Sequence, residues 1–158
     1  MVKHSIFFTS WVIIICSLFQ MGCAKGVNIS PIRSDLRSDD ENVRWRGLLK
    51  VAVIGPDCKE LEPDIIDMLD EGNWRLRQSA ILALSSIEHS DKAIPRIAEM
   101  LNDESEWVRF AAVEDLKRLG NKAVATLGSL RILASEDESE FVREAAEEAI
   151  NVIDGNIS

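Results

Sequence analysis

The chain has 158 residues, of which 46% are apolar and 28% charged, which is the length and composition of one ordinary globular domain. Its 27 acidic residues outnumber its 18 basic residues, and the resulting net charge of −9 argues against nucleic acid as a ligand, because an acidic surface repels phosphates. The three cysteines have no paired spacing, which argues against a disulfide framework and a zinc site.

The first 22 residues have the pattern of a signal peptide. A basic start at Lys3 precedes an apolar run over residues 6–19, which is short for a membrane span and has the length of a signal h-region. The glycine and Cys23 that follow resemble the lipobox of bacterial lipoproteins, although Gln20 and Met21 depart from the leucine and small residue preferred there. The resemblance predicts a lipid on Cys23 and an exported, membrane-anchored protein of the cell envelope or periplasm. A cleaved secretory signal and an uncleaved anchor are the alternatives.

The next segment, residues 23–36, is predicted to be a polar tether. Its central part reads AKGVNISPIRS and includes Pro31. Such a sequence favours an extended linker between the anchor and the domain that follows over residues 37–158.

That domain repeats one pattern. Residues 103–120 read DESEWVRFAAVEDLKRLG and residues 137–154 read DESEFVREAAEEAINVID, and the two align without a gap at an offset of 34. Two weaker copies precede them. The predicted repeats cover residues 37–69, 70–101, 102–135 and 136–154.

Each copy contains an arginine that follows an apolar residue, at successive spacings of 33, 32 and 34 residues. Apolar or small residues lie one position before this arginine and three, seven and ten positions after it, and these offsets fall on one stripe of an α-helix. The residue at the third position is always small, which indicates that a neighbouring helix approaches closely there. The marker arginines are Arg44, Arg77, Arg109 and Arg143, and the small residues are Gly47, Ala80, Ala112 and Ala146.

Second amphipathic helices are predicted between the first ones, over residues 61–69, 91–101 and 122–134. Pro63 and Pro95 lie 32 residues apart, so the proline follows the same period. The fourth copy ends after its first helix, whose acidic outer side predicts a C-terminal cap. The residues of this cap predicted to face inward are Phe141, Val142, Ala145, Ala146, Ala149, Ile150 and Ile153. The fold class is therefore all-α.

The repeated pattern can be written D-x-x-x-W-V-R-x-A-A-x-x-x-L-x-x-L-G, followed by A-[IV]-P-x-[IL]. It looks like the short HEAT-like repeats first named from phycobilisome lyases, and the resemblance covers residues 39–154. It implies a right-handed α-solenoid of the armadillo/HEAT type with about three and a half helix-pair repeats. It implies little about activity, because that family contains lyases and scaffolds.

The marker arginines are predicted to bond acidic residues or loop carbonyls of the adjacent repeat, such as Asp70, Asp103 and Asp137. The alternative is a basic ladder that binds an anionic ligand. The acidic residues that crowd the same turns would neutralise such a ladder, which favours the structural role.

Aromatic residues recur at the starts of the first helices. Trp74, Trp107 and Phe141 occupy matched positions, and their recurrence favours packing between repeats. Trp45 and Phe110 directly follow a marker arginine and lie opposite the buried stripe. They are expected to be covered by the tether or to belong to a contact surface.

No set of catalytic side chains can be assembled from the sequence. His89 stands alone in a turn, and Cys58 is interpreted as a small residue at a helix start rather than a nucleophile. The acidic runs 39–41 and 136–138 lack the spacing of a calcium loop and are interpreted as solvated first turns of helices. The sequence predicts no enzyme, no cofactor and no metal.

The predicted function is a non-catalytic interaction or scaffold module at the bacterial cell envelope. A solenoid presents its second helices on a concave face, and mixed charge there suits a protein or peptide partner. The alternative is a lyase or lyase accessory, which the resemblance alone suggests and which would need a chromophore pocket. The candidate partner-binding residues are Asp64, Asp67, Lys92, Arg96, Glu99 and Arg131.

Overall fold

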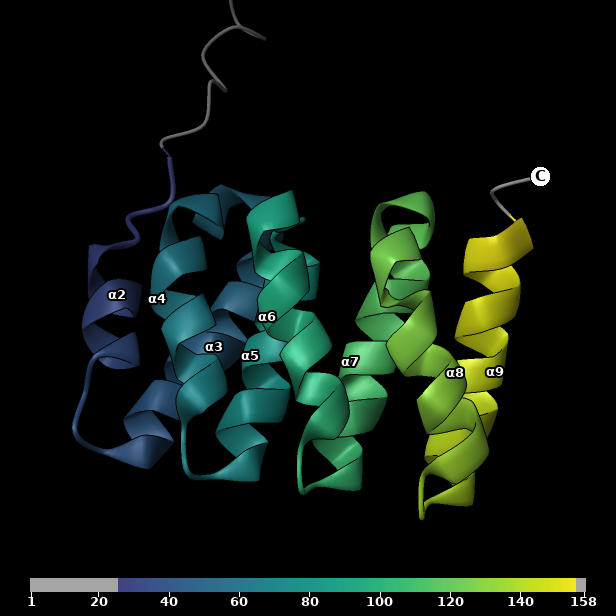
Figure 1. Cartoon of the computed structure of the whole chain (residues 1–158). Helices are drawn as coiled ribbons and strands as arrows, with labels where there is room; N and C mark the ends of the chain where they lie inside the picture. The colour runs from purple at the N-terminus through teal and green to yellow at the C-terminus, as the bar shows by residue number, and fades with distance from the viewer. Residues whose placement is uncertain (1–25, 156–158) are drawn as a thin grey trace, which may run out of the picture.

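The structure is a stack of helices, shown in Figure 1 as a computed structural model that describes residues 26–155. Within that range every regular element is an α-helix or a 3-10 helix, so the all-α prediction is confirmed. None of the described helices is long and apolar enough to cross a membrane. The α-helices are α2 (Ser30–Leu36), α3 (Glu41–Ile54), α4 (Glu62–Asp67), α5 (Trp74–Ser86), α6 (Ile94–Glu99), α7 (Glu106–Leu119), α8 (Leu127–Glu136) and α9 (Glu140–Gly155).

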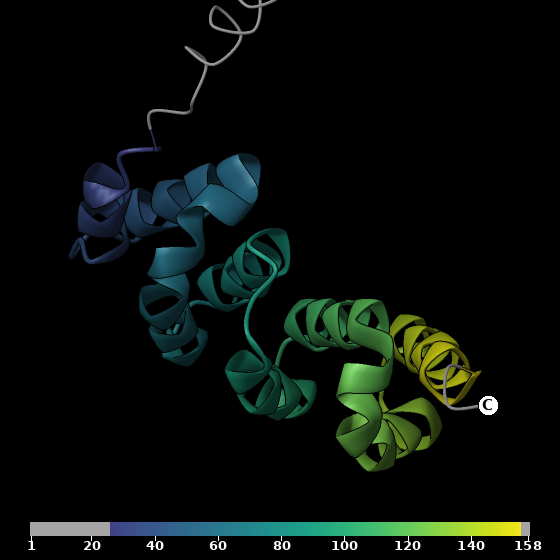
Figure 2. The same ribbon diagram turned by 90° about the horizontal axis from the view of Figure 1, so that it is seen from above.

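The helices form two rows. Seen from above, the first helices α3, α5, α7 and α9 make one row and the second helices α4, α6 and α8 make the other (Figure 2). Within the first row, α3 packs on α5, α5 on α7 and α7 on α9. The stack is an α-solenoid, as the sequence predicts, because each helix pair buries its apolar side against the neighbouring pairs.

The second helices are broken into short pieces by 3-10 turns. Seven-residue 3-10 helices, Gly55–Leu61 and Gly120–Thr126, lead into α4 and α8, and shorter ones flank α4 and α6. Gly55 and Gly120 have φ angles of 73° and 55°, which a residue with a Cβ atom adopts only with strain. These glycines therefore end α3 and α7 and reverse the chain toward the second row.

One continuous apolar core runs through the stack. Ala80, Ala112 and Ala146 are fully buried, which agrees with the predicted helix crossings. In the first repeat, a Cβ atom added to Gly47 would lie 3.0 Å from the Leu36 side chain and 3.2 Å from its backbone nitrogen. Only a residue without a side chain lets α2 approach α3 this closely.

The prediction of a polar tether over residues 23–36 is wrong for its C-terminal part, residues 30–36. The segment from Ser30 folds into α2, which packs on α3 and buries Ile32 and Leu36. Pro31 lies in the first turn of this helix, where its missing N–H costs nothing, so the proline marks a helix start and not a linker. α2 therefore covers the N-terminal end of the core, which the sequence analysis left uncovered.

The last helix covers the opposite end. α9 buries one side and exposes its glutamates, as expected of a C-terminal cap. The inward prediction is wrong for Phe141, which is 45% exposed, and Ile150 is only partly buried. Phe141 precedes the buried stripe that begins at Val142, so its ring lies beside the core. The buried residues of α9 are Val142, Ala145, Ala146, Ala149 and Ile153.

Candidate functional site

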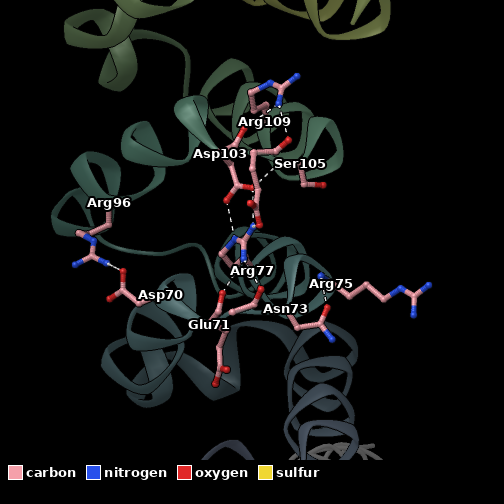
Figure 3. A network of polar contacts seen from close by, with 11 residues as sticks. Asp70, Glu71, Asn73, Arg75, Arg77, Arg96, Asp103, Ser105 and Arg109 are labelled. Atoms are coloured by element: carbon pink, nitrogen blue, oxygen red, sulfur yellow. Dashed lines mark hydrogen bonds and ion pairs between the residues drawn. The ribbon is translucent and has the colours of Figure 1, made fainter. Parts of the chain in front are cut away.

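The marker arginines tie each repeat to the next along the edge where the first helices begin. Arg77 of α5 places Nε 2.7 Å and Nη2 2.8 Å from the two carboxylate oxygens of Asp103 (Figure 3). Its third nitrogen, Nη1, donates to the backbone carbonyls of Glu71 and Gly72 at 2.8 and 3.0 Å. The planar guanidinium thus joins the loop before its own helix to the loop before the next one.

Arg109 of α7 repeats this geometry one step further along the stack. Its Nε and Nη2 lie 2.7 and 2.9 Å from the carboxylate of Asp137, and Nη1 donates to the carbonyl of Asp103 at 2.8 Å. The side chains of Arg109 and Asp137 are only 7% and 3% exposed. The hydrogen bonds to Asp137 raise the pKa of Arg109 above its ordinary value against the opposing effect of burial, so the pair stays ionised.

The two end arginines differ from this pattern. Arg44 pairs with Glu71 at 2.8 Å, and the prediction of Asp70 as a partner is wrong, because Asp70 binds Arg96 of the second row at 2.7 Å. Arg143 donates to the carbonyl of Asp137 at 2.6 Å in its own loop. Three of the four arginines thus bond a carboxylate of the following repeat, and this neutralisation disfavours the anion-ladder alternative.

A buried polar cluster, which the sequence analysis missed, links three repeats. The Nε2 atom of His89 lies 2.7 Å from Asp115 of α7, and Asp115 also accepts hydrogen bonds from Ser85 of α5 and from Arg118. On the other side of the cluster, the hydroxyl of Ser90 donates to Glu62 of α4 at 2.5 Å. An acidic residue on an otherwise apolar helix side was the one available sequence signal, at Asp115.

The geometry fixes the protonation of His89. Its Nδ1 lies 3.0 Å from the carbonyl of Ser90 and its Nε2 faces the Asp115 carboxylate, so both ring nitrogens meet acceptors and both must donate. Burial lowers the pKa of His89, but the hydrogen bonds to Asp115 and Ser90 outweigh burial and leave the pKa raised. Burial raises the pKa of Asp115, but hydrogen bonds from His89, Ser85 and Arg118 leave it lowered. The pair is an imidazolium and a carboxylate enclosed between repeats.

Several of the predicted partner-binding residues already have partners inside the chain. Asp64 lies 3.1 Å from Arg33 and 2.6 Å from Arg37, both on or next to α2, and its side chain is only 10% exposed. Arg96 pairs with Asp70 and with Glu99. Arg131 pairs with Asp154 at 2.9 Å. Asp64, Arg96 and Arg131 thus hold neighbouring elements together, whereas Glu99 pairs with Arg96 within α6.

The other two predicted residues, Asp67 and Lys92, are exposed and border one groove. This second-helix groove lies between α2, α4 and the 3-10 turn that precedes α6, and it has a volume of about 670 Å³. Pro63 and Ile66 of α4 give it an apolar surface. Its lining residues are Arg33, Lys59, Glu60, Glu62, Pro63, Ile66, Asp67, Ser90 and Lys92.

The aromatic residues are not all buried between repeats. Trp74 packs against the core, but Trp107 and Phe141 are 47% and 45% exposed, so the packing interpretation is incomplete for them. Phe110 stacks on Phe141 with ring centroids 4.1 Å apart. Trp45 stays 43% exposed with α2 in place, which excludes cover by the described part of the predicted tether.

The side chains considered for catalysis or metal binding lie in environments that favour structural roles. Cys58 is fully buried, and burial together with Asp57 raises the pKa of its thiol, so the thiolate needed for nucleophilic attack is disfavoured. In the acidic runs, Asp40 accepts the backbone N–H of Asn42 and Asp137 accepts that of Ser139. Within residues 26–155 no three acidic, histidine or cysteine side chains gather as metal ligands would.

A family model for HEAT repeats matches residues 62–151, which is more than half of the chain. The chain belongs to the HEAT-repeat family. The prediction of HEAT repeats is thereby confirmed. Among curated proteins, this HEAT-repeat chain is 27% identical over 124 residues to the eIF-2-alpha kinase activator GCN1 of Saccharomyces cerevisiae. That alignment covers 70% of the chain but only 5% of GCN1, so it concerns the repeats and not the whole activator.

Solved structures similar to this HEAT-repeat chain include designed repeat proteins. The designed armadillo repeat protein YIII(Dq.V1)4CPAF in complex with peptide (KR)4 has a TM-score of 0.63 and 22% identity over 80% of this chain and 64% of that one. The designed armadillo repeat protein YIII(Dq)4CqI has a TM-score of 0.60 and 23% identity over 77% and 63% of the two chains. At these identities the similarity establishes the solenoid fold alone.

Proposed function

We propose that this HEAT-repeat chain is a non-catalytic interaction module that binds a protein or peptide of the bacterial cell envelope in the second-helix groove. The observation that carries the proposal is the groove itself. It combines an apolar surface at Pro63 and Ile66 with opposite charges at Asp67 and Lys92. Neither of these two charges forms an ion pair with another residue of the range 26–155, unlike Asp64 and Arg131.

The size and chemistry of the groove suit a short segment of a partner. A volume of about 670 Å³ lies in the range of sites that enclose a small ligand or a few side chains. Charges at the border fix the orientation of a bound segment, while the apolar surface supplies affinity. A designed relative by fold was solved with a peptide, which is compatible with peptide binding by a stack of this shape.

Location at the envelope rests on the N-terminal sequence. The predicted signal peptide and Cys23 lie outside the described residues, which begin at residue 26, three positions after the cysteine. A lipid on Cys23 would hold α2 and the second-helix groove close to the membrane surface. The natural partner is then an envelope protein within reach of that surface.

Photo-crosslinking in cells tests the proposal. A photoreactive amino acid replaces the exposed Asp67 in the groove, and a matched variant carries it at the exposed Glu147 on α9. We expect a discrete adduct with one envelope protein from position 67 and none from position 147. Equal adducts from both positions, or none from position 67, would contradict binding in this groove.

A further inference from the structure

A second surface, at the starts of α5, α7 and α9, carries large aromatic side chains that are only partly buried in the stack. Trp107 and Phe141 each leave close to half of their side chain in solvent, and their ring centroids are 6.2 Å apart. Phe110 stacks behind Phe141 and fixes its ring. Neighbouring aromatic rings that are rigidly held and half exposed are characteristic of interaction surfaces.

A groove of about 540 Å³ runs beside Trp107 and is acidic. It is lined by three glutamates and by no basic residue. Glu104 and Glu138 are 82% and 83% exposed, and Glu106 is held in place by the hydroxyl of Ser139 at 2.6 Å. The complete lining of this edge groove is Trp74, Glu104, Ser105, Glu106, Trp107, Glu138 and Ser139.

The arginines behind the edge groove cancel only part of its charge. Arg77 and Arg109 each form a close two-point ion pair with a buried aspartate and reach the exposed glutamates only at 3.2 and 3.4 Å. Two guanidinium charges are therefore shared among four carboxylates, those of Asp103, Asp137, Glu104 and Glu138. Glu106 adds a fifth carboxylate, so the edge groove keeps an excess of negative charge around Trp107.

The chain itself shows which group this combination attracts. The guanidinium carbon of Arg75 lies 5.3 Å from the centre of the Trp74 ring, a cation–π contact at the matched position one repeat earlier. Among the described residues, no lysine or arginine makes such a contact with Trp107. A tryptophan face bordered by carboxylates is a favourable site for a cationic side chain.

The geometry points to the edge groove as a binding site for a basic peptide segment, with one lysine or arginine of the partner seated on Trp107 between Glu104, Glu106 and Glu138. This site goes beyond the proposed function, because it lies at the starts of the first helices and not in the second-helix groove. It would accept a positively charged strand or tail of a protein and reject an acidic one.

Fluorescence anisotropy with the full chain in mild detergent tests the site. The probe is a labelled peptide of alternating lysine and glycine, and its glutamate–glycine counterpart is the charge control. We expect the basic peptide to bind and the acidic one not to bind. Trp107→Ala should weaken binding at least about fivefold, and Trp107→Leu, which keeps apolar volume, should weaken it similarly because it also removes the ring.

Matched charge variants distinguish binding in the edge groove from non-specific attraction of a basic peptide to an acidic chain. Glu104→Gln with Glu138→Gln should lower affinity about tenfold, while Glu144→Gln with Glu147→Gln, the same change on the exposed side of α9, should lower it less than about twofold. Asp67→Ala should leave peptide binding unchanged whatever its effect in the second-helix groove. Equal losses for the two glutamate pairs, wild-type affinity in both Trp107 variants, or no binding of the basic peptide would overturn the inference.

Discussion

Removal of Arg109 should destabilise the whole stack, because this side chain joins the third repeat to the C-terminal cap. Arg109→Ala deletes a two-point ion pair with Asp137 and two hydrogen bonds to the carbonyls of Asp103 and Glu104. The remaining Asp137 carboxylate is 3% exposed and cannot recover its lost partner from water. Its one other hydrogen bond comes from the backbone N–H of Ser139 at 2.9 Å.

The expected loss in the free energy of unfolding is about 3 kcal/mol. Breaking a buried ion pair by removing one partner costs about 3–5 kcal/mol, and the surviving bond from Ser139 to Asp137 favours the lower end. Domains have a total stability of about 5–15 kcal/mol, so the loss is a large fraction. For a domain of this size it corresponds to a fall of about 10 °C in Tm.

Urea unfolding followed by circular dichroism at 222 nm measures this loss. Lys122→Ala is the matched control, because Lys122 forms an exposed ion pair with Asp91 and its removal should cost less than about 1 kcal/mol. A double-mutant cycle with Asp137→Asn should give a coupling energy of about 2 kcal/mol between the two residues. An Arg109→Ala variant within about 0.5 kcal/mol of wild type would refute the structural role of the marker arginines.

Three further predictions concern other parts of the chain. Ala112→Leu should cost about 1–3 kcal/mol by overpacking at a fully buried helix crossing, while Ala125→Leu at an exposed position should be neutral in the same urea titration. The pKa of His89 is raised in the folded chain, so protonated His89 stabilises the fold fully at pH values below its pKa in the unfolded chain, and this stability is lost as pH rises through its pKa in the folded chain. Urea midpoints measured from about pH 5.5 to 9 should therefore depend less on pH in His89→Gln than in the wild type. Mass spectrometry of the mature protein should find a lipid on Cys23 as its first residue, and an unmodified cysteine would refute lipidation.

The sequence was sufficient to predict the parts of the fold that repeat. The marker arginines and the small residues beside them recur at a constant spacing, and each repeat tests the interpretation of the others. Arg77 and Arg109 accordingly bond Asp103 and Asp137, the partners expected from the sequence. Periodicity predicts these contacts because the same geometry is built each time.

The ends of the stack were not predictable in this way. α2 occurs once, has only two buried residues, Ile32 and Leu36, and lies in a polar segment that resembles a linker. At the other end of the stack, Phe141 is half exposed, and so is Trp107 at the matched position one repeat earlier, so the recurrence of an aromatic residue did not indicate burial. At Arg44 the loop geometry brings Glu71 rather than Asp70 within reach, a difference of one residue that spacing alone cannot resolve.

Contacts between residues at non-equivalent positions of the repeats could not be predicted from the sequence either. His89 in a turn and Asp115 on α7 are separated by 26 residues and belong to no repeated pattern, so only the fold brings them together. The same holds for the second-row ion pairs that occupy Asp64, Arg96 and Arg131. Surface positions on the second helices could be predicted from periodicity, but their availability to a partner could not.

The affinity of the crosslinked partner for chains altered in the second-helix groove tests the account most directly. Isothermal titration should compare the wild type with Asp67→Ala combined with Lys92→Ala, and with Glu144→Ala combined with Glu147→Ala on α9 as the control. Loss of the two groove charges should raise Kd at least about tenfold, while the α9 pair should change it less than about twofold. A Kd unchanged by the groove variant would contradict the claim that this stack binds its partner through the second-helix groove.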